Sequence, residues 1–359
     1  MTGNSGLHRT LCKRAAFRQD PRVREATWLA WLRGVSRSFY LTVRVLPRKV
    51  REPVGIAYLL ARAADTIADT DALPVERRIE TLRRLRERIV SHHTEDLELD
   101  AVAAGQSSPA ERKLLRVVEY LINRVDTTPP ETRDPIRNVL DTIISGQELD
   151  LERFGAAGGD RLLALQTDAE LDDYTYRVAG CVGEFWTKVT RIHLFPTYFV
   201  DFKRLLARSV RFGKGLQLVN ILRDFPRDLR QGRCYLPELV LREHGLIPED
   251  LLDPANGARF RPLYTRYLLR AEDHLAVGWQ YALSLPYRQM RLRLACAWPL
   301  LIGLRTLALL RVGNVLDPEH HIKVSRPQVR SIMLRSTLLY PVAGLWGGMF
   351  DRARRHAAP

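Results

Sequence analysis

The chain has 359 residues, of which 46% are hydrophobic and 27% charged, and its formal net charge is +15. This composition excludes an intrinsically disordered chain, and the length allows a large core in one domain or two. The positive excess favours a polyanionic partner, namely a phosphorylated substrate, an anionic membrane surface or a nucleic acid.

Two features bear on the compartment. The first 20 residues are polar and basic without an apolar core, so they are not typical of a secretory signal. The cysteines are widely spaced and form no CxxC pair, which argues against a disulfide framework or a zinc site; they are Cys12, Cys181, Cys234 and Cys296. We therefore expect a cytoplasmic protein.

Apolar residues recur at helical spacing along most of the chain, whereas signals for strands and hairpins are weak. Long helical patterns occupy residues 74–90, 129–154, 171–192, 199–229 and 260–283. Short segments containing Pro or Gly separate the helical patterns, and none is typical of an interdomain linker. The sequence predicts a single large all-α domain over 1–359, with its core at 25–335.

Two apolar stretches near the C-terminus are candidates for membrane contact. Residues 295–310 include Arg305, and no stretch reaches the ~18 consecutive apolar residues of a membrane span, so a buried core helix explains them better. Residues 336–350 contain Pro341 and precede the basic sequence RARRH. The apolar and basic tail at 336–359 is either a packing segment or a peripheral contact with the inner face of a membrane, and packing is the simpler interpretation.

Two pairs of aspartates occur in apolar helical patterns. Asp65 and Asp69 lie in ARAADTIADT, and Asp224 and Asp228 lie in NILRDFPRDL. In a helix, each pair shares a face with other polar residues: Tyr58 and Arg62 in the first segment, and Gln217 with Asn220 or Ile221 in the second. Because dry, unpaired burial of carboxylates is unfavourable, these faces are expected to line a polar part of a cavity.

Two such helices facing each other would bring four carboxylates together, and these would repel unless cations lay between them. Oxygen ligands without His or Cys favour Mg²⁺ or Mn²⁺, and Mg²⁺ commonly bridges carboxylates to substrate phosphates. The same segments contain Arg62, Arg223 and Arg233. A guanidinium group can bind two phosphate oxygens at once through a bidentate contact. The pattern predicts a site for a diphosphate and its metal ions. The alternative is that the aspartates pair with the chain's many arginines.

Four blocks resemble, in order, those of the squalene/phytoene synthases, a family of head-to-head isoprenyl diphosphate synthases. They are VSRSFYLTVRVLP (35–47), YLLARAADTIADT (58–70), YTYRVAGCVGEFW (174–186) and LQLVNILRDFPRDLRQGRCYLPE (216–238). The resemblance implies an isoprenoid synthase fold, all-α and built around a central cavity. It also implies that two farnesyl diphosphates, or longer prenyl diphosphates, condense through a cyclopropyl diphosphate.

Matched position by position, the resemblance gives Asp65, Asp69, Asp224 and Asp228 the Mg²⁺-diphosphate role and gives Tyr174 a role in proton handling. Phe39 matches an aromatic residue beside the prenyl chains. Gln147 and Asp150 match a further polar patch near the reacting centre. The positions similar to diphosphate-holding residues are Ser36, Arg37, Tyr58, Arg62, Gln217, Asn220, Arg223 and Arg233.

The product is squalene if NADPH reduces the final cation, and phytoene or dehydrosqualene if it does not. Thr66 stands where many phytoene-type relatives have another aspartate, and residues 313–329 resemble a loop of squalene synthases, so both features favour squalene. Lys323 and Arg326 in this loop are candidates to meet the phosphates of NADPH, with simple solvation as the alternative. No GxGxxG follows a strand, so a nicotinamide site would not be of the Rossmann type.

Two other classes are possible in principle. A class I terpene cyclase shares the metal chemistry but lacks the SRSF and GRCYLP blocks. A basic helical nucleic-acid-binding protein fits the charge of +15, but the arginines are dispersed and no aromatic–basic motif occurs. We therefore expect farnesyl diphosphate as a small-molecule substrate, no nucleic-acid partner, and a monomer.

Overall fold

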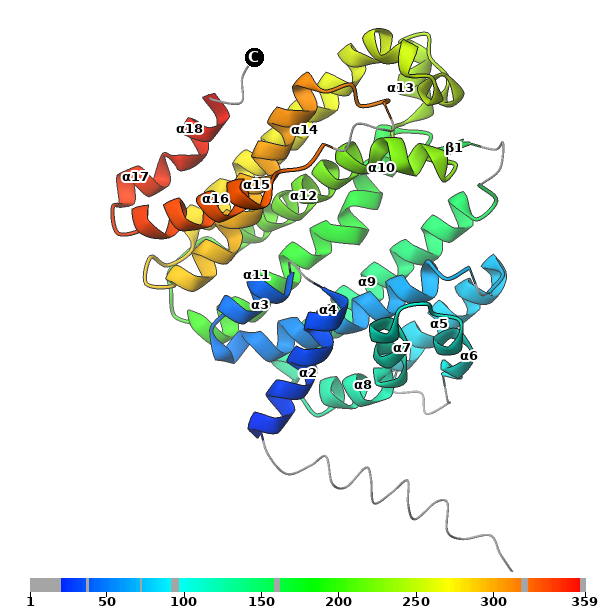
Figure 1. Cartoon of the computed structure of the whole chain (residues 1–359). Helices are drawn as coiled ribbons and strands as arrows, with labels where there is room; N and C mark the ends of the chain where they lie inside the picture. Colours follow the sequence, from blue (N-terminus) through cyan, green and yellow to red (C-terminus); the bar gives the residue numbers. More distant parts are fainter. Residues whose placement is uncertain are drawn as a thin grey trace, which may run out of the picture.

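The computed structural model describes residues 21–36, 39–71, 73–91, 97–157, 162–317 and 322–355 (Figure 1). These residues are almost entirely helical, which confirms the predicted all-α class. The α-helices are α2 (Pro21–Val35), α3 (Phe39–Val45), α4 (Arg48–Ala68), α5 (Val75–Ser91), α6 (Asp100–Ala104), α7 (Pro109–Arg116), α8 (Val118–Asp126), α9 (Pro130–Phe154), α10 (Asp168–Thr175), α11 (Cys181–Leu194), α12 (Phe202–Arg230), α13 (Glu238–Glu243), α14 (Gly257–Ser284), α15 (Met290–Val312), α16 (Arg326–Leu339), α17 (Ala343–Gly347) and α18 (Met349–Arg355).

Four predicted helices, α5, α9, α12 and α14, have boundaries within three residues of those read from the sequence. Their ends follow ordinary helix chemistry. Pro130 opens α9 at a position whose N–H would have no helical partner. The side chain of Asp201 accepts a hydrogen bond from the backbone N–H of Arg204 and caps α12.

The pattern at 171–192 predicts one helix, but the structure contains three segments there. α10 ends at Thr175, a π-helical turn, η1, follows at Tyr176–Gly180, and α11 begins at Cys181. A π turn widens the helix locally and rotates the residues that follow it, so it changes which side chains of α11 share a face with those of α10.

Glycines allow this irregular segment to approach α12 closely. A Cβ atom on Gly183 would lie 2.0 Å from the backbone oxygen of Ser209, and one on Gly213 would lie 2.1 Å from the oxygen of Ala179. Neither distance is compatible with a side chain, so any larger residue at Gly183 or Gly213 would separate the two helices.

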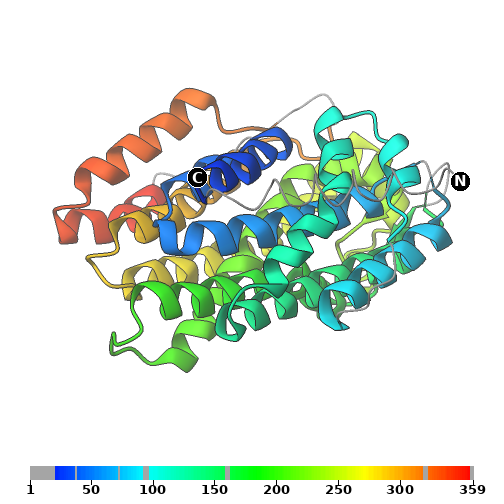
Figure 2. The ribbon, with the colours of Figure 1, turned by 90° about the horizontal axis from the view of Figure 1, so that it is seen from below.

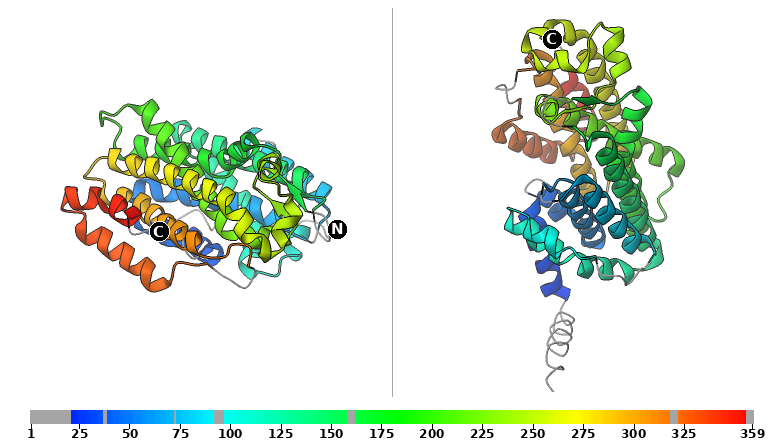
Figure 3. Two further views of the ribbon diagram at one scale, coloured as in Figure 1. Left: turned by 90° about the horizontal axis from the view of Figure 1, so that it is seen from above. Right: turned by 90° about the vertical axis from the view of Figure 1, so that its right-hand side faces the viewer.

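The long helices run side by side along the length of the molecule (Figures 2 and 3). α4, α9, α11 and α12 pack next to one another, α5 covers the outer face of α9, and α14 packs along α12 and then against α15. Buried side chains from α2 to α18 form one hydrophobic cluster. The site described below lies between the first four of these helices.

α15 is the one helix in the described ranges that is long and apolar enough to cross a membrane. Of its most apolar stretch, 61% is buried inside the molecule. It packs against α12, α14 and α16, and most of its leucines are buried. The structure therefore confirms the interpretation of residues 295–310 as a core helix.

The C-terminal helices both pack on the core and expose apolar side chains. Trp346 and Phe350 are buried and stack on Trp279, with ring centroids 4.9 and 5.8 Å away. The buried guanidinium group of Arg293 lies 4.5 Å from the ring of Trp346. Part of the tail is thus a packing segment, whereas Leu338 is 67% exposed.

The two short strands β1 (Leu163–Ala164) and β2 (Arg233–Cys234) pair in parallel, with Leu163 opposite Arg233. Gly232 precedes β2 with a φ of +79°, a conformation that favours glycine, and it turns the chain sharply after α12. This turn and the strand pair fix the positions of Arg233 and Tyr235.

Candidate active site

A cavity of about 1100 Å³ lies between α4, α9, α11 and α12, which is large for a small-molecule site. Carboxylates and carboxamides from the C-terminal halves of α4, α9 and α12 line its polar part. Apolar and aromatic residues line the rest: Phe39, Val54, Ala57, Ala61, Val139, Ile143, Val178, Val182, Phe185, Trp186 and Ile221 among others.

Most of the residues predicted from the sequence meet in this one cavity. They are Phe39, Tyr58, Asp65, Asp69, Gln147, Asp150, Tyr174, Gln217, Asn220, Asp224, Asp228 and Arg233. Arg37 lies outside the described residues. Lys323 and Arg326 are exposed and do not line the cavity, and Arg326 begins α16 immediately after its N-cap.

The first acidic wall is formed by α4. The amide of Gln147 donates a hydrogen bond to Asp65, and the guanidinium group of Arg62 lies 3.8 Å from the same carboxylate. Burial among the cavity walls raises the pKa of Asp65 to about 6; repulsion from Asp69 adds to the rise, whereas Arg62 and Gln147 oppose it.

Two predicted diphosphate ligands of this region lie behind the cavity wall. Arg62 donates to Glu111 at 2.5 Å and does not line the cavity. The buried hydroxyl of Ser36 accepts a hydrogen bond from the backbone N–H of Phe39 at 3.2 Å and is a hydrogen-bond partner of Tyr58. Phe39 and Tyr58 stack with their ring centroids 4.3 Å apart, so Ser36 orients two rings that do line the cavity.

The second acidic wall is formed by α12, which continues through Pro226 without a break. Both carboxylate oxygens of Asp224 accept hydrogen bonds from Arg223, which does not itself line the cavity. Burial raises the pKa of Asp228 to about 7, with Asp224 contributing repulsion and Arg227 opposing the rise.

Asp150 of α9 interacts electrostatically with an aspartate of each acidic wall. Burial raises its pKa to about 6, with Arg233 and Tyr235 opposing the rise and the charge of Asp69 contributing to it. The charge of Asp150 in turn raises the pKa of Asp228. Asp69 of α4, Asp150 of α9 and Asp228 of α12 all line this cavity, so the two walls face the same polar space, as the paired sequence motifs predict.

The donor set fits hard divalent cations. Aspartate oxygens and the carboxamides of Gln147, Gln217 and Asn220 line the polar part. Within the described residues, no group of three or more His, Cys, Asp or Glu side chains is placed to hold a metal ion on its own. Mg²⁺ is commonly bound by one or two carboxylates together with water and substrate phosphates, so this arrangement suits a metal that arrives with a diphosphate.

Sequence reasoning missed several cavity residues. Tyr235 belongs to the GRCYLP block, but its side chain had no assigned role. Arg78 lies in the helical pattern at 74–90; its guanidinium group donates a hydrogen bond to the carbonyl of Ala68 at 2.9 Å, and the residue lines the cavity. Asp71, Arg227 and Gln231 also line it. These residues lie close in sequence to the two aspartate pairs, and this closeness was the sign from which their place in the cavity could have been predicted.

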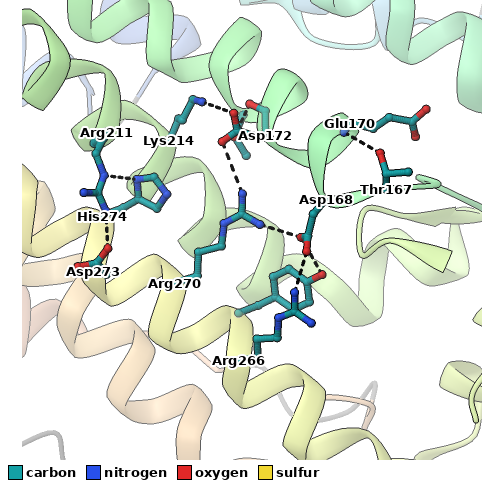
Figure 4. A network of polar contacts seen from close by, with 12 residues as sticks. Thr167, Asp168, Glu170, Asp172, Arg211, Lys214, Arg266, Arg270, Asp273 and His274 are labelled. Carbon is teal, nitrogen blue, oxygen red and sulfur yellow. Dashed lines mark hydrogen bonds and ion pairs between the residues drawn. The ribbon is translucent and has the colours of Figure 1, made fainter. Parts of the chain in front are cut away.

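A polar network outside the cavity holds α10, and with it Tyr174, against α12 and α14 (Figure 4). Asp168 accepts hydrogen bonds from Arg266 at 2.9 Å and Arg270 at 2.7 Å. Asp172 accepts one from Lys214 of α12 at 2.7 Å. These contacts set the position of α10 relative to the second acidic wall.

An all-helical molecule with two acidic walls at one part of an apolar cavity has the isoprenoid synthase fold. Among solved structures, it superimposes on TcSQS in complex with the ligand E5700 with a TM-score of 0.72 and 21% identity, over 92% of this chain and 97% of that one. It also matches a dehydrosqualene synthase in complex with a ligand, with a TM-score of 0.61 and 21% identity, over 90% of this chain and 99% of that chain.

Residues 32–328 match the squalene/phytoene synthase family, and the chain belongs to that family. It is 25% identical over 308 residues to the squalene synthase of Cyberlindnera jadinii, which covers 85% of this chain and 65% of that protein. It is 29% identical over 244 residues to the bifunctional lycopene cyclase/phytoene synthase of Colletotrichum graminicola, covering 67% of this chain. The chain therefore spans 39% of the Colletotrichum protein and just under two thirds of the Cyberlindnera squalene synthase.

Proposed function

We propose that this protein is a Mg²⁺-dependent prenyltransferase that condenses two farnesyl diphosphates head to head. The expected route is through presqualene diphosphate to squalene, with NADPH as the reductant. The observation that carries the proposal is the single cavity in which both aspartate pairs, Tyr174 and an apolar, aromatic wall come together. Family membership supports the same reaction class.

The polar part of the cavity suits the diphosphate groups. Asp65, Asp69, Asp224 and Asp228 would hold Mg²⁺, which stabilises the negative charge of a departing diphosphate. Arg233 lines the same region and offers a guanidinium group to phosphate oxygens. Arg223 keeps the Asp224 carboxylate oriented through its two hydrogen bonds.

The apolar part of the cavity suits the prenyl chains and the cations formed from them. Phe185 and Trp186 of α11 line it, together with the stacked pair of Phe39 and Tyr58. Such walls exclude water that would otherwise quench an allylic cation, and aromatic faces stabilise positive charge. The chain's own residues therefore supply a charged part of the cavity that binds diphosphate and an apolar part that protects the cations from water.

The alternative product is phytoene or dehydrosqualene, formed without reduction. Thr66 favours squalene through the resemblance of DTIAD to the motif of squalene synthases; its buried hydroxyl donates to the carbonyl of Arg62 at 2.9 Å. Lys323 and Arg326 lie away from the cavity, so the described residues do not define a site for NADPH, and no reduction step is derived.

Incubating the purified protein with farnesyl diphosphate and Mg²⁺, with and without NADPH, and identifying the hydrocarbons by mass spectrometry tests the proposal. Squalene that appears only with NADPH supports it. Dehydrosqualene in both samples supports the alternative. The absence of any coupled product from farnesyl or geranylgeranyl diphosphate would refute the proposed function.

A further inference from the structure

Head-to-head coupling must dispose of a proton, and this inference rests on the proposed function. When carbon C1 of one prenyl group bonds to C2 of the other, positive charge develops at C3 of the second group. Closing the cyclopropane ring forms a bond between C1 of the first group and C3 of the second, as the electron pair of a C1–H bond of the first group moves into the new bond and its proton leaves. The cavity must therefore contain a group that receives a proton.

Tyr174 cannot do this alone. Its side chain is half-buried in the wall of the cavity, and burial raises the pKa of its hydroxyl well above the ordinary value, so it is a neutral phenol at physiological pH. A neutral phenol is a weak base and can take up a proton only if it passes its own proton on at the same time.

The neighbours of Tyr174 provide such a path. Its ring stacks on that of Tyr235 with centroids 4.6 Å apart, and the two hydroxyls are hydrogen-bond partners. The hydroxyl of Tyr235 in turn lies 3.3 and 3.4 Å from the two carboxylate oxygens of Asp150, to which it donates. All three side chains line the cavity.

We propose that Tyr235 and Asp150 form a proton relay behind Tyr174 and receive the proton lost during coupling. The Tyr174 oxygen takes the proton from carbon while its own proton passes to Tyr235, and the proton of Tyr235 passes to the Asp150 carboxylate. Both tyrosines end neutral, as they began, and the carboxylate becomes a carboxylic acid.

The surroundings of Asp150 suit a temporary proton acceptor. Arg233 lies 3.5 Å from one carboxylate oxygen and favours the charged form before the reaction. Burial and repulsion act the other way and hold the pKa of Asp150 at about 6, so a proton is retained more readily than by a solvated aspartate. The charged groups that act on Asp150 from other positions are Asp69, Arg153 and, reciprocally, Asp228.

The test compares Tyr235→Phe and Asp150→Asn with a matched control, Tyr267→Phe. Tyr267 is a fully buried tyrosine that donates to Asp168 at 3.1 Å, outside the cavity, so its variant loses the same kind of hydroxyl–carboxylate contact. Each protein is given farnesyl diphosphate and Mg²⁺ without NADPH. Released diphosphate and coupled cyclopropyl product are both measured.

For Tyr235→Phe and Asp150→Asn, we expect kcat for coupled product to fall about 10²-fold with KM little changed. Diphosphate release should exceed coupling, because ionisation precedes the blocked proton loss. A double variant with Tyr174→Phe should be no slower than Tyr174→Phe alone, as expected for groups that act as a unit. Tyr267→Phe should retain the wild-type ratio of release to coupling.

An active wild type with an equally active Tyr235→Phe variant would overturn the relay alone. So would a slower Tyr235→Phe variant that still releases diphosphate and coupled product in the wild-type ratio, because that pattern indicates a structural role. A wild-type protein that yields no coupled product would overturn the proposed function, and the relay with it.

A separate observation concerns the surface of α16 and α17. Leu334, Leu338, Val342 and Leu345 follow one another at intervals of three or four residues and are 61%, 67%, 51% and 46% exposed. We call these four residues the apolar ridge. Arg326, Arg330 and Arg335 are exposed on α16, the helix that carries Leu334 and Leu338. A surface that combines exposed leucines with arginines is typical of a helix lying in a membrane interface.

We infer that the apolar ridge docks on an anionic lipid bilayer. The arginines of α16 and the net charge of +15 complement anionic headgroups, and the leucines can insert among the acyl chains. The proposed substrate carries a prenyl chain and the proposed product is a hydrocarbon, and both partition into lipid. Docking would keep the protein beside their reservoir.

Removing residues 336–359 would disturb the core as well as the apolar ridge, because Trp346 and Phe350 are buried in the core. The double variant Leu334→Gln/Leu338→Gln leaves those contacts in place. Leu269→Gln is the matched control, since Leu269 is a 53% exposed leucine on another helix, α14. The full chain and both variants are sedimented with vesicles of phosphatidylglycerol and of phosphatidylcholine.

We expect the wild type and Leu269→Gln to sediment with phosphatidylglycerol vesicles and the ridge variant to lose at least about 10-fold in binding. Binding should weaken with added salt. Equal sedimentation of the ridge variant would overturn the inference, as would a wild type that binds neither kind of vesicle. Formation of dimers through the ridge without vesicle binding would assign this surface to protein contact instead.

Discussion

The guanidinium group of Arg223 donates hydrogen bonds to both carboxylate oxygens of Asp224, its neighbour in the sequence, at 2.9 and 2.7 Å. Adjacent helical residues point in different directions, so Arg223 must fold back to reach Asp224. This contact fixes the carboxylate at the edge of the second acidic wall. A metal ion that binds Asp224 would meet a carboxylate that is already oriented, which is the arrangement expected of a preorganised site.

Asp224→Asn tests the role of this wall. The amide keeps the shape of the side chain but loses the charge that a metal ion requires, so we expect kcat to fall by about 10³-fold, with the unfolding temperature nearly unchanged. Steady-state kinetics and thermal unfolding measure both. Asp273→Asn is the control, because Asp273 pairs with Arg211 on an exposed surface. Near-normal turnover by Asp224→Asn would exclude Asp224 from the metal site.

Ligand binding can be measured without turnover. Mg²⁺ and inorganic pyrophosphate together should raise the unfolding temperature, because they bind the folded state and relieve the repulsion among the aspartates. We expect a smaller rise from either alone and none in the presence of a chelator. Asp65→Asn should remove most of the combined effect. Equal stabilisation of wild type and Asp65→Asn would show that pyrophosphate binds elsewhere.

Gly183→Ala tests the close approach of α11 and α12. The new Cβ would lie 2.0 Å from the backbone oxygen of Ser209, so the helices must separate. We expect the free energy of unfolding to fall by about 1–3 kcal/mol, as measured by denaturant titration. Gly344→Ala in α17 meets no atom within 4 Å and should be neutral or slightly stabilising. Equal effects at the two positions would contradict the packing described here.

The buried position of His274 leads us to expect that the free energy of unfolding falls in acid. Burial, and then Arg211 and Arg270, lower its pKa from 6.5 to about 4, with Lys214 adding to the effect and Asp273 opposing it (Figure 4). The unfolded chain therefore binds more protons than the folded one between these values. The stability that neutral His274 contributes is complete above pH 6.5 and is lost as pH falls toward 4, by up to about 1.4 kcal/mol per pH unit.

Unfolding experiments at pH 7 and pH 4.5 measure this sensitivity. The difference in unfolding free energy between the two pH values should be smaller in His274→Gln than in the wild type. His244→Gln, at an exposed position after α13, should retain the wild-type difference. If His274→Gln lost as much stability in acid as the wild type, another group would be responsible.

The features that local sequence patterns describe were predictable. The polar stripe from Gln217 to Asp228 could be read because α12 is regular through this stretch and continues through Pro226. The polar stripe that contains Asp65 and Asp69 could be predicted from the sequence for the same reason. Both stripes become visible in the sequence because polar residues recur at helical spacing within otherwise apolar helices.

The features that depend on distant pairing were not predictable. Tyr235 faces Asp150 because β2 pairs with β1, some seventy residues earlier in the chain. Arg62 turns toward Glu111 because α7 packs beside α4, a contact that no local pattern encodes. The π turn at Tyr176–Gly180 interrupts a sequence whose periodicity indicates one helix, because packing against α12 outweighs local preference there.

The most direct test of the central claim is a product assay with purified protein, farnesyl diphosphate and Mg²⁺, with hydrocarbons and diphosphates separated and identified by mass spectrometry. The two facing acidic walls predict a cyclopropyl diphosphate in the absence of NADPH and no product after the metal is chelated. The proposed function adds that this diphosphate is converted to squalene when NADPH is supplied. Coupled product of undiminished yield in the presence of the chelator, or farnesyl diphosphate recovered intact in its absence, would contradict the account.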